Sequence, residues 1–499
     1  MAPRKVRYIH FREEVRKYNP NDLIPFLAAE ATRHQDLTTA WDDRWVKGFP
    51  PWFLAAAARD SLVYGNVNGH RNREMSPGRF ITMRNLFTEA HDNPIVGASM
   101  TMADLALMLG RYAYEQFPYQ SSVMEELARP YILFSDTDVP EQYRRPEPDE
   151  WKDVLGGTIE QALSASFIIF VGVMHNNGVF DPAVFTADWY SQVDRVVPSE
   201  VGLRVLDILT ATVEEAREDG RSAPELPDYL QRYSYNPLVK TPLIDIGDGL
   251  RYAPQPQFVL RAMTTENLYY RGMRQWAGDN FGAALGMRVQ AYTGRQLRHS
   301  GEHTVIEEFR WEQKKRGGVD SSDWFLVTPQ VTVLIECKSA RMGYAAKAGT
   351  PDGVKQANTV LGKAFGQIRN NADEIRAGNP AYAHIPADRP LVGLVVTAEP
   401  FYTANTPPVR EVLPDPGIPT MTISLRELEL LAALSPSEVG AGLEDIVAND
   451  ELYTWPLALA LPKVLPNLHE DRDNSLLSDA YETAFLPLTE RWPTGGPDQ

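Results

Sequence analysis

The chain has 499 residues, of which 43% are hydrophobic and 23% charged, a composition typical of a folded protein with two to four domains. Its single cysteine, Cys337, excludes an internal disulfide framework and a cysteine-based zinc site, and the charged N-terminal segment lacks an apolar stretch, which predicts a cytoplasmic protein. The net charge of −17 alone argues against a nucleic-acid partner, but residues 288–376 carry 14 Lys and Arg against 10 Asp and Glu, so a local basic cleft is compatible with the sequence.

Residues 1–235 are predicted to form a mostly helical N-terminal domain. Apolar residues recur at three- and four-residue spacing in 21–35, 100–117 and 198–219. The longest uncharged stretch, 161–180, contains several amide and hydroxyl side chains, which favours a buried helix over a membrane span. We therefore expect no membrane partner.

Four aromatic residues lie close together at Trp45, Phe49, Trp52 and Phe53. Such a cluster could stack on the bases of a ligand, but aromatic side chains more often pack in a core, and we favour core packing.

A polar, proline-rich stretch at 218–242 predicts a domain boundary. The following segment, 242–254, has the pattern of a short hairpin. Asp245 and Asp248 could bind a metal, but Asp248 precedes a glycine, and this dipeptide is typical of a turn. We therefore expect these two aspartates to stabilise a turn rather than to bind a metal.

From residue 264 the pattern changes to helix, strands, helix and strand. Helices are predicted at 266–277, 280–292 and 353–378, and strands at 303–313, 323–327, 331–338 and 391–398. Asp279 is predicted to cap the second helix and Gly294 to end it. Only residues 328–330 separate the second and third strands, so these two strands are predicted to form a hairpin. From about residue 420 the chain is expected to be helical again.

The strand 331–338 ends with Glu336, Cys337 and Lys338. Side chains alternate along a strand, so Glu336 and Lys338 share one face and Cys337 points to the other. A carboxylate and an ammonium at the end of a buried strand are costly unless they pair or bind a ligand. Asp323 opens the preceding strand, and the hairpin would place it beside Glu336.

Two carboxylates and a lysine in this arrangement suit the hydrolysis of phosphodiesters. Mg²⁺ takes oxygen ligands, which Asp323, Glu336 and the backbone carbonyl of Cys337 would supply. The metal would activate a water, and Lys338 would orient that water or offset the charge on the phosphate.

The spacing of Asp323 and Glu336-Cys337-Lys338 resembles the D…ExK signature of the PD-(D/E)XK, or restriction-endonuclease-like, nucleases, and the order of elements over about 140 residues is similar to their core. The resemblance implies that Asp323 and Glu336 bind Mg²⁺ or Mn²⁺ and that Lys338 is the catalytic lysine. It also implies a catalytic role for Gln367 on the following helix, and contacts of Lys363 and Arg341 with the nucleic acid.

Several alternatives stay open. Many members of this family have a glutamate on the helix before the first strand, whereas 280–292 contains no acid, and Asp279, Glu307 or Glu308 could replace it. Asp320 is a rival to Asp323, although it lies in a glycine-rich turn where Asp is common. Lys338 could activate Cys337 as a thiol, but a buried core residue is the favoured interpretation because the two side chains point to opposite faces.

These observations predict an α/β nuclease core with a central mixed sheet flanked by helices at 236–420, between a helical N-terminal domain at 1–235 and a helical C-terminal extension at 421–499. The predicted function is a metal-dependent endonuclease that cleaves DNA rather than RNA. By analogy it would act in prokaryotic defence, as a homo-oligomer or with a partner protein. The alternatives are a nuclease-fold module that binds nucleic acid or protein without cleavage, and an interaction protein that works through its helices.

Overall fold

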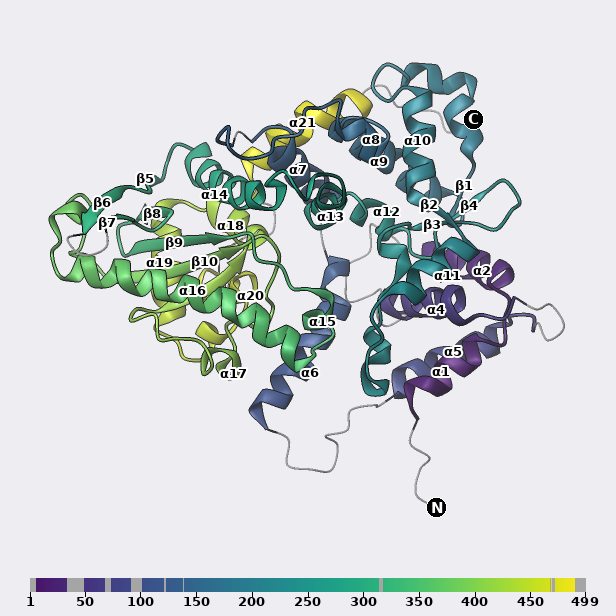
Figure 1. Ribbon diagram of the computed structural model, residues 1–499, viewed down its shortest axis with the longest axis horizontal. Helices are drawn as coiled ribbons and strands as arrows, with labels where there is room; N and C mark the ends of the chain where they lie inside the picture. Colours follow the sequence, from purple (N-terminus) through teal and green to yellow (C-terminus); the bar gives the residue numbers. More distant parts are fainter. Residues whose placement is uncertain are drawn as a thin grey trace.

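The computed structural model describes residues 6–33, 49–67, 73–90, 101–120, 123–137, 139–313, 317–466, 468 and 472–489. It is a mixed α/β structure in which helices flank mixed sheets (Figure 1). A five-stranded sheet occupies one side of the molecule, most helices of the N-terminal half gather on the other, and α6 and α7 lie between them (Figure 1).

The N-terminal half is largely helical, as predicted, and also contains a small sheet. Its helices are α1 (Tyr8–Val15), α2 (Pro20–Arg33), α4 (Pro51–Tyr64), α5 (Pro77–Glu89), α6 (Met102–Gln116), α7 (Val123–Phe134), α8 (Trp151–Leu155), α9 (Ile159–His175), α10 (Ser199–Leu209) and α11 (Val213–Ser222). The small sheet has the order β1-β4-β3-β2, with β1 (Val179–Phe180), β2 (Thr210–Thr212), β3 (Leu243–Asp245) and β4 (Arg251–Tyr252).

Asp245, at the end of β3, and Asp248, between β3 and β4, act as turn residues, as expected. Asp248 accepts the backbone N–H of Leu250 at 3.0 Å and the hydroxyl of Tyr252 at 2.7 Å. Asp245 accepts the N–H of Gly247 at 2.7 Å. Both carboxylates are therefore used by the hairpin itself.

The uncharged stretch 161–180 forms most of α9 and then β1, and Ile168, Ile169 and Phe170 of α9 are buried in the main core. Within the described ranges, one candidate membrane span is found, Trp151–His175, and 67% of its most apolar window is buried inside the structure. Of the aromatic cluster, Phe53 is buried in the N-terminal core as predicted, while Trp45 lies outside the described residues.

The central sheet has the strand order β11-β10-β9-β8-β5. The elements of this region are α12 (Gln257–Arg261), α13 (Thr265–Trp276), α14 (Phe281–His299), β5 (Thr304–Glu307), β6 (Arg310–Gln313), β7 (Gly317–Asp320), β8 (Trp324–Val327), β9 (Thr332–Lys338), α15 (Tyr344–Lys347), α16 (Pro351–Arg376), β10 (Leu391–Thr397), α17 (Pro407–Arg410) and β11 (Thr420–Ser424). β5, β8 and β9 are antiparallel neighbours, whereas β9, β10 and β11 run parallel. The predicted hairpin of β8 and β9 is present, with Trp324 opposite Ile335.

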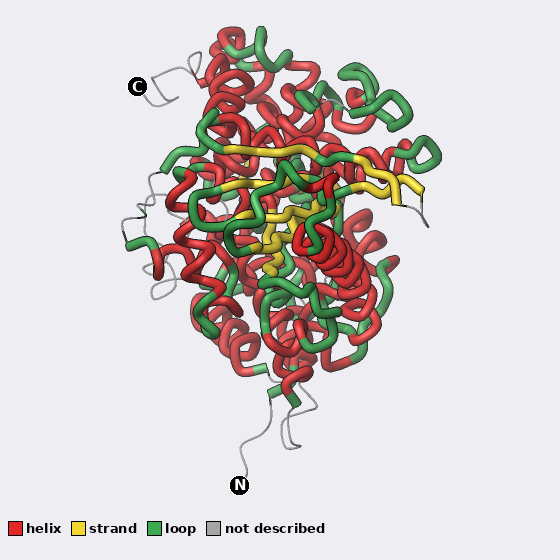
Figure 2. Tube along the Cα trace, turned by 90° about the vertical axis from the view of Figure 1, so that its left-hand side faces the viewer, coloured by secondary structure: helices red, strands yellow, loops and turns green. Residues whose placement is uncertain are grey.

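The prediction of a single strand over 303–313 is wrong. β5 pairs with β8, but β6 pairs with β7 in a separate two-stranded ribbon. The break falls at Glu308 and Phe309 because the chain leaves β8 there and begins to pair with β7. Glu308 N–H donates to the Asp323 carbonyl at 2.9 Å, and Phe309 N–H donates to the Ser321 hydroxyl at 2.9 Å. The ribbon extends away from the sheet (Figure 2).

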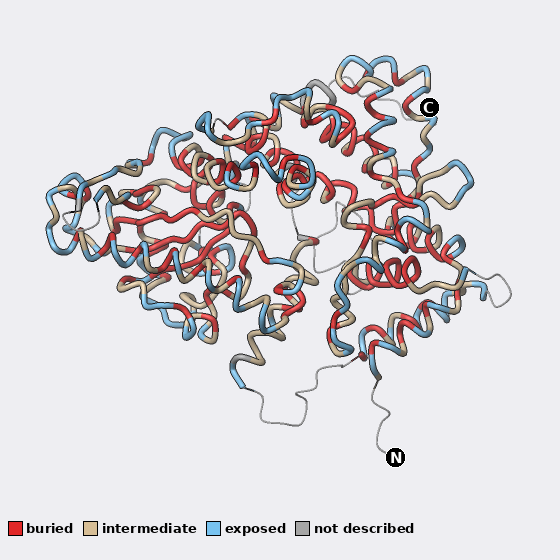
Figure 3. Tube along the Cα trace, in the orientation of Figure 1, coloured by how far each residue is buried: buried red, intermediate tan, exposed pale blue. Residues whose placement is uncertain are grey.

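Helices cover both faces of the central sheet. Val333, Ile335 and Cys337 of β9 belong to the same core cluster as α14, whereas Leu334 belongs to the cluster of α16. The strands β8, β9 and β10 are buried along most of their length (Figure 3). Side chains alternate along a strand, so Glu336 and Lys338 lie on the same face as Leu334, the face covered by α16.

Gly294 does not end its helix, contrary to the prediction, since α14 continues to His299. A Cβ atom at Gly294 would lie 2.3 Å from the indole of Trp324, so the glycine permits close packing of the helix on the sheet. Asp279 is not the cap either, because Asn280 occupies the N-cap position with a φ of 58°.

The C-terminal region contributes a strand as well as helices. β11 at Thr420–Ser424 is the edge strand of the sheet, and four helices follow it: α18 (Leu425–Ala432), α19 (Pro436–Val447), α20 (Leu457–Val464) and α21 (Ser475–Thr489). One apolar core runs through α7, α9, α14, the sheet and α21. The central sheet therefore shares its core with α7 and α9 of the N-terminal half and with the C-terminal helices, whereas the first helices of the chain form a separate core.

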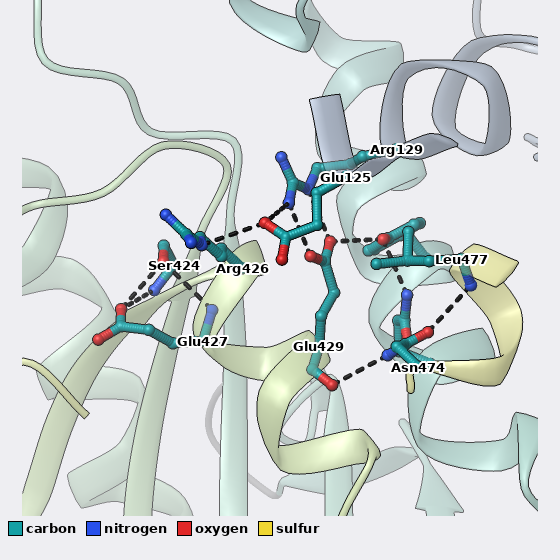
Figure 4. Close-up of polar contacts among 10 residues, drawn as sticks. Glu125, Arg129, Ser424, Arg426, Glu427, Glu429, Asn474 and Leu477 are labelled. Atoms are coloured by element: carbon teal, nitrogen blue, oxygen red, sulfur yellow. Dashed lines mark hydrogen bonds and ion pairs between the residues drawn. The ribbon is translucent and has the colours of Figure 1, made fainter. Parts of the chain in front are cut away.

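A buried polar network joins these regions (Figure 4). Arg129 of α7 donates to both carboxylate oxygens of Glu429 on α18, at 2.6 and 2.7 Å. The hydroxyl of Tyr292 on α14 donates to the same carboxylate at 2.6 Å, and Asn474 before α21 donates to the Glu429 carbonyl at 2.9 Å. Glu429 is 3% exposed, so these bonds replace the water that the carboxylate loses on folding.

Candidate active site

The β8–β9 hairpin brings Asp323, Glu336 and Lys338 together, as the sequence predicted. Because Trp324 pairs with Ile335, the next position of the ladder places Asp323 beside Glu336. The backbone N–H of Cys337 donates to Asp323 Oδ2 at 2.6 Å, which ties the aspartate to the end of β9.

Glu336 and Lys338 form an ion pair at this strand end. Lys338 Nζ donates to Glu336 Oε2 at 3.1 Å, and the Glu336 side chain is fully buried while that of Lys338 is 20% exposed. Glu336 Oε1 is buried and accepts no hydrogen bond of ordinary geometry, and the Ser322 hydroxyl, which is also buried and unpaired, lies near this carboxyl. A carboxylate oxygen with no donor in a buried position is costly, so this atom is suited to a ligand that supplies positive charge.

The acid–base properties of the two carboxyls follow from this geometry. The pKa of Glu336 is raised to about 8, first because burial disfavours the charged form and second because Asp323 repels it, while Lys338 and the Ser322 hydroxyl act in the opposite direction. Burial also raises the pKa of Asp323, against the hydrogen bond from Cys337 N–H and the charge of Lys338. Both carboxyls would become more acidic if a cation were bound between them.

Glu308 is the alternative acid that the structure places nearest to the trio. Burial raises its pKa, and Asp323 contributes to the increase, whereas Gln290 of α14 donates to its Oε2 at 3.0 Å and lowers it. Glu307 instead accepts from Arg298 at 3.3 Å and is exposed, and Asp279 lies at the start of α14, 3.9 Å from Arg144. An amide on α14 and an acid between β5 and β6 thus lie next to the trio.

Asp320 lies on β7, where its carboxylate pairs with Arg310 at 3.6 Å, outside the trio. This placement favours Asp323 over Asp320. The thiol of Cys337 is buried on the α14 side of the sheet, and burial raises its pKa well above the ordinary value. A thiol in this environment is a core group rather than a nucleophile.

The polar residue of α16 that reaches this strand end is Asn371, which sequence reasoning missed. Its Oδ1 accepts the N–H of Ser322 at 3.1 Å and the hydroxyl of Tyr382, and its side-chain amide donates to the Gln367 carbonyl at 2.9 Å. Gln367 and Lys363 are exposed on α16. The sequence shows only an asparagine next to the apolar stripe 361–375, and its burial becomes visible in the structure.

A groove of about 420 Å³ opens beside Lys338. Its walls include Tyr270, Arg341 and, from α16, Gln356 and Val360. Residues 356, 360, 363 and 367 follow one another at helical spacing, so Lys363 and Gln367 continue the stripe that begins at the groove. Gln356 was not predicted from the sequence.

Arg341 lines this groove as well. Its guanidinium carbon lies 3.1 Å from the centre of the Tyr269 ring and 5.5 Å from that of Tyr270, and its Nη1 atom is buried without a hydrogen-bond partner. The cation is held against aromatic rings and keeps donor capacity for a ligand.

The trio fits a hard divalent cation that is held by few protein ligands. Mg²⁺ usually keeps several waters and binds one or two carboxylates, so Asp323, Glu336 and the adjacent Cys337 carbonyl are a sufficient donor set. Among the described residues, no group of three or more His, Cys, Asp or Glu side chains is arranged to hold a metal. The observation that supports a cation at this position is the Glu336 Oε1 atom, which is buried and accepts no hydrogen bond.

Comparison with known proteins adds no relative. No protein-family model, curated protein or solved structure matches this chain. The functional argument therefore rests on the chemistry of the site.

Proposed function

We propose that the protein is a metal-dependent nuclease of the PD-(D/E)XK type, with Asp323, Glu336 and Lys338 as its catalytic centre. The observation that carries the proposal is the buried Glu336, which lies beside a second carboxylate and has one oxygen on Lys338 and one that accepts no hydrogen bond. Lys338, its partner, lines a groove. This arrangement is expensive for stability alone, which favours a functional role.

The residues divide the work as follows. Asp323 and Glu336 would hold the cation, which when bound supplies Lewis acidity and an activated water. Lys338 carries a partly exposed ammonium that can orient the attacking water or donate to a phosphate oxygen. Arg341 and Gln356 line the groove on the path that a phosphate backbone would follow, and both can donate hydrogen bonds to it. We propose DNA as the preferred substrate.

The test is cleavage of supercoiled plasmid, single-stranded DNA and RNA with Mg²⁺ or Mn²⁺ by the wild type and four variants. Glu336→Gln and Lys338→Ala should each lower the rate by about 100-fold or more, because each removes a group that acts on the reacting phosphate. Glu308→Gln should lower it less, and Glu307→Gln is the matched control that should leave the rate unchanged, because its carboxylate pairs with Arg298 away from the trio. RNA cleaved faster than DNA would contradict the substrate assignment.

The second candidate is a nuclease fold that binds nucleic acid without cutting it. Gln290 on α14 favours this possibility, since an amide is a poor ligand for a second divalent metal where an acid would be a strong one. Binding of DNA by both wild type and Lys338→Ala with no metal-dependent cleavage by either would support the scaffold and reject the enzyme.

A further inference from the structure

A large cavity lies between the helices of the N-terminal half and the helices α12, α13 and α15. It has a volume of about 750 Å³ and is bounded by α4, α6, α12, α13, α15 and the segment 232–236. These elements converge at the centre of Figure 1, where the two halves of the molecule meet. The volume is within the range of small-molecule and cofactor sites, about 300–1,000 Å³.

The charge of the cavity is opposite to that of the protein. Its lining includes eight Lys or Arg and three Asp or Glu residues, whereas the whole chain has 49 basic and 66 acidic residues. Four of the eight cations, Arg59, Arg232, Lys240 and Lys347, form ion pairs with carboxylates. The charges of these four cations are therefore neutralised by carboxylates of the protein itself.

The other four cations are Arg111, Arg261, Arg271 and Arg274, and among the described residues none of them forms an ion pair with a carboxylate. Arg111 is 6% exposed and donates once, to the Gly349 carbonyl at 3.2 Å, while its buried Nε has no partner. A buried guanidinium without a counter-ion is unfavourable, and a bound anion would compensate it.

Arg271 and Arg274 lie one turn apart on α13 and face the same cavity. Arg271 donates to the Lys240 carbonyl at 2.9 Å. Burial and the neighbouring Arg274 lower the pKa of Arg271 to about 10. The like charges repel each other, and an anion placed between them would relieve that repulsion.

Flat aromatic surfaces accompany these cations. The rings of Tyr119 and Phe258 stack at 5.9 Å between centroids, and Arg261 lies over both, at 5.7 and 5.1 Å. Tyr270 is 46% exposed and lines the cavity as well as the groove beside Lys338. Arginines bind phosphate groups through paired donors, and aromatic rings and guanidinium planes bind the faces of nucleobases.

We propose that this cavity is a binding site for a free nucleotide of one or two nucleosides, with its phosphates on Arg111, Arg271 and Arg274. Its base would lie against the exposed ring of Tyr270 and the Arg261 guanidinium, which covers the largely buried rings of Tyr119 and Phe258. The site is separate from the proposed cleavage centre, because Tyr270 is the one residue that lines both spaces. A simple anion would use the arginines but not the rings, and an apolar ligand would use the rings but leave the arginines unpaired.

The test is calorimetric titration of the full chain, in EDTA so that nothing is cleaved, with ATP, GTP, CTP, UTP, the dinucleotide pApA and inorganic tripolyphosphate. At least one nucleotide should bind more tightly than tripolyphosphate, because only the nucleotide engages the rings. The double variant Arg271→Ala/Arg274→Ala should weaken that nucleotide about tenfold or more, and Lys338→Ala should bind it as the wild type does. Thermal melting of each variant checks that it is folded.

Three results would overturn the proposal: no nucleotide binds, tripolyphosphate binds as tightly as the best nucleotide, or the arginine variant binds that nucleotide unchanged. Tighter binding of a single-stranded 20-mer through the same arginines would also overturn it, since the cavity would then hold part of a polymer. None of these results bears on metal-dependent cleavage by Lys338, so the two proposals fail independently.

Discussion

Replacing Glu336 with glutamine should change the stability of the protein in a way that depends on pH. In the folded protein the pKa of Glu336 is about 8, whereas an unperturbed glutamate has an ordinary value of 4.5. The folded state therefore holds this proton more tightly than the unfolded state. Glu336 contributes most to stability below pH 4.5, and that contribution is lost as the pH rises through 8.

The magnitude follows from the same difference. One pKa unit corresponds to about 1.4 kcal/mol, so the interval from 4.5 to about 8 amounts to roughly 5 kcal/mol at full ionisation. Glutamine is neutral at every pH and does not incur this loss. Without metal, the free energy of unfolding of Glu336→Gln should therefore rise by up to about 5 kcal/mol relative to the wild type between pH 4.5 and 8.5, although the variant loses cleavage.

The assay is urea denaturation of both proteins in EDTA at several pH values in this interval. Glu307→Gln is the control, since that carboxylate is exposed and its difference from the wild type should not vary with pH. Mg²⁺ at pH 8 should stabilise the wild type more than Glu336→Gln, because only the ionised carboxylate is a strong ligand. A difference between wild type and Glu336→Gln that stays constant over the whole interval would refute the reasoning.

Two further substitutions test how the fold is held together. Arg129→Ala leaves the buried Glu429 carboxylate without its ion pair and should lower the free energy of unfolding by about 3–5 kcal/mol. Arg472→Ala breaks a partly exposed surface pair and should lower it by about 1 kcal/mol or less. Equal losses for the two variants in urea denaturation would contradict this account. Gly294→Ala places a methyl group 2.3 Å from an indole ring and should destabilise the protein by about 1–3 kcal/mol. Gly366→Ala on α16 meets nothing within 4 Å and should stabilise the protein by about 0.5–1 kcal/mol. If the melting temperature shifts in the same direction for both variants, packing at Gly294 is looser than described.

The hairpin that carries Asp323, Glu336 and Lys338 could be predicted because it is local. All three residues lie within 16 positions of one another, and the alternation of side chains on a strand and the short connection at 328–330 are sufficient to bring them together. The helix 351–376 and the strand β10 were likewise predictable, since each has a clear apolar period of its own.

The remaining features depend on contacts between distant segments. A glycine at position 294 looks the same in the sequence whether it ends a helix or leaves room for the Trp324 indole. Only the packing of α14 on the sheet distinguishes these two roles. β11 is a five-residue strand that is recognisable by its pairing with β10 rather than by its composition. Asn371 looks like any polar residue on a helix until Ser322 is placed next to it, 49 positions away.

By itself the sequence determined that two acids and a lysine meet at the end of a buried strand, because strand alternation and a tight connection act over a few residues. Only the tertiary structure decided that Glu308 approaches the trio while Glu307 turns away, and that arginines from α6, α12 and α13 face one cavity. The physical reason is that such convergence is set by the packing of whole elements on a shared core, to which no single segment carries a local signal.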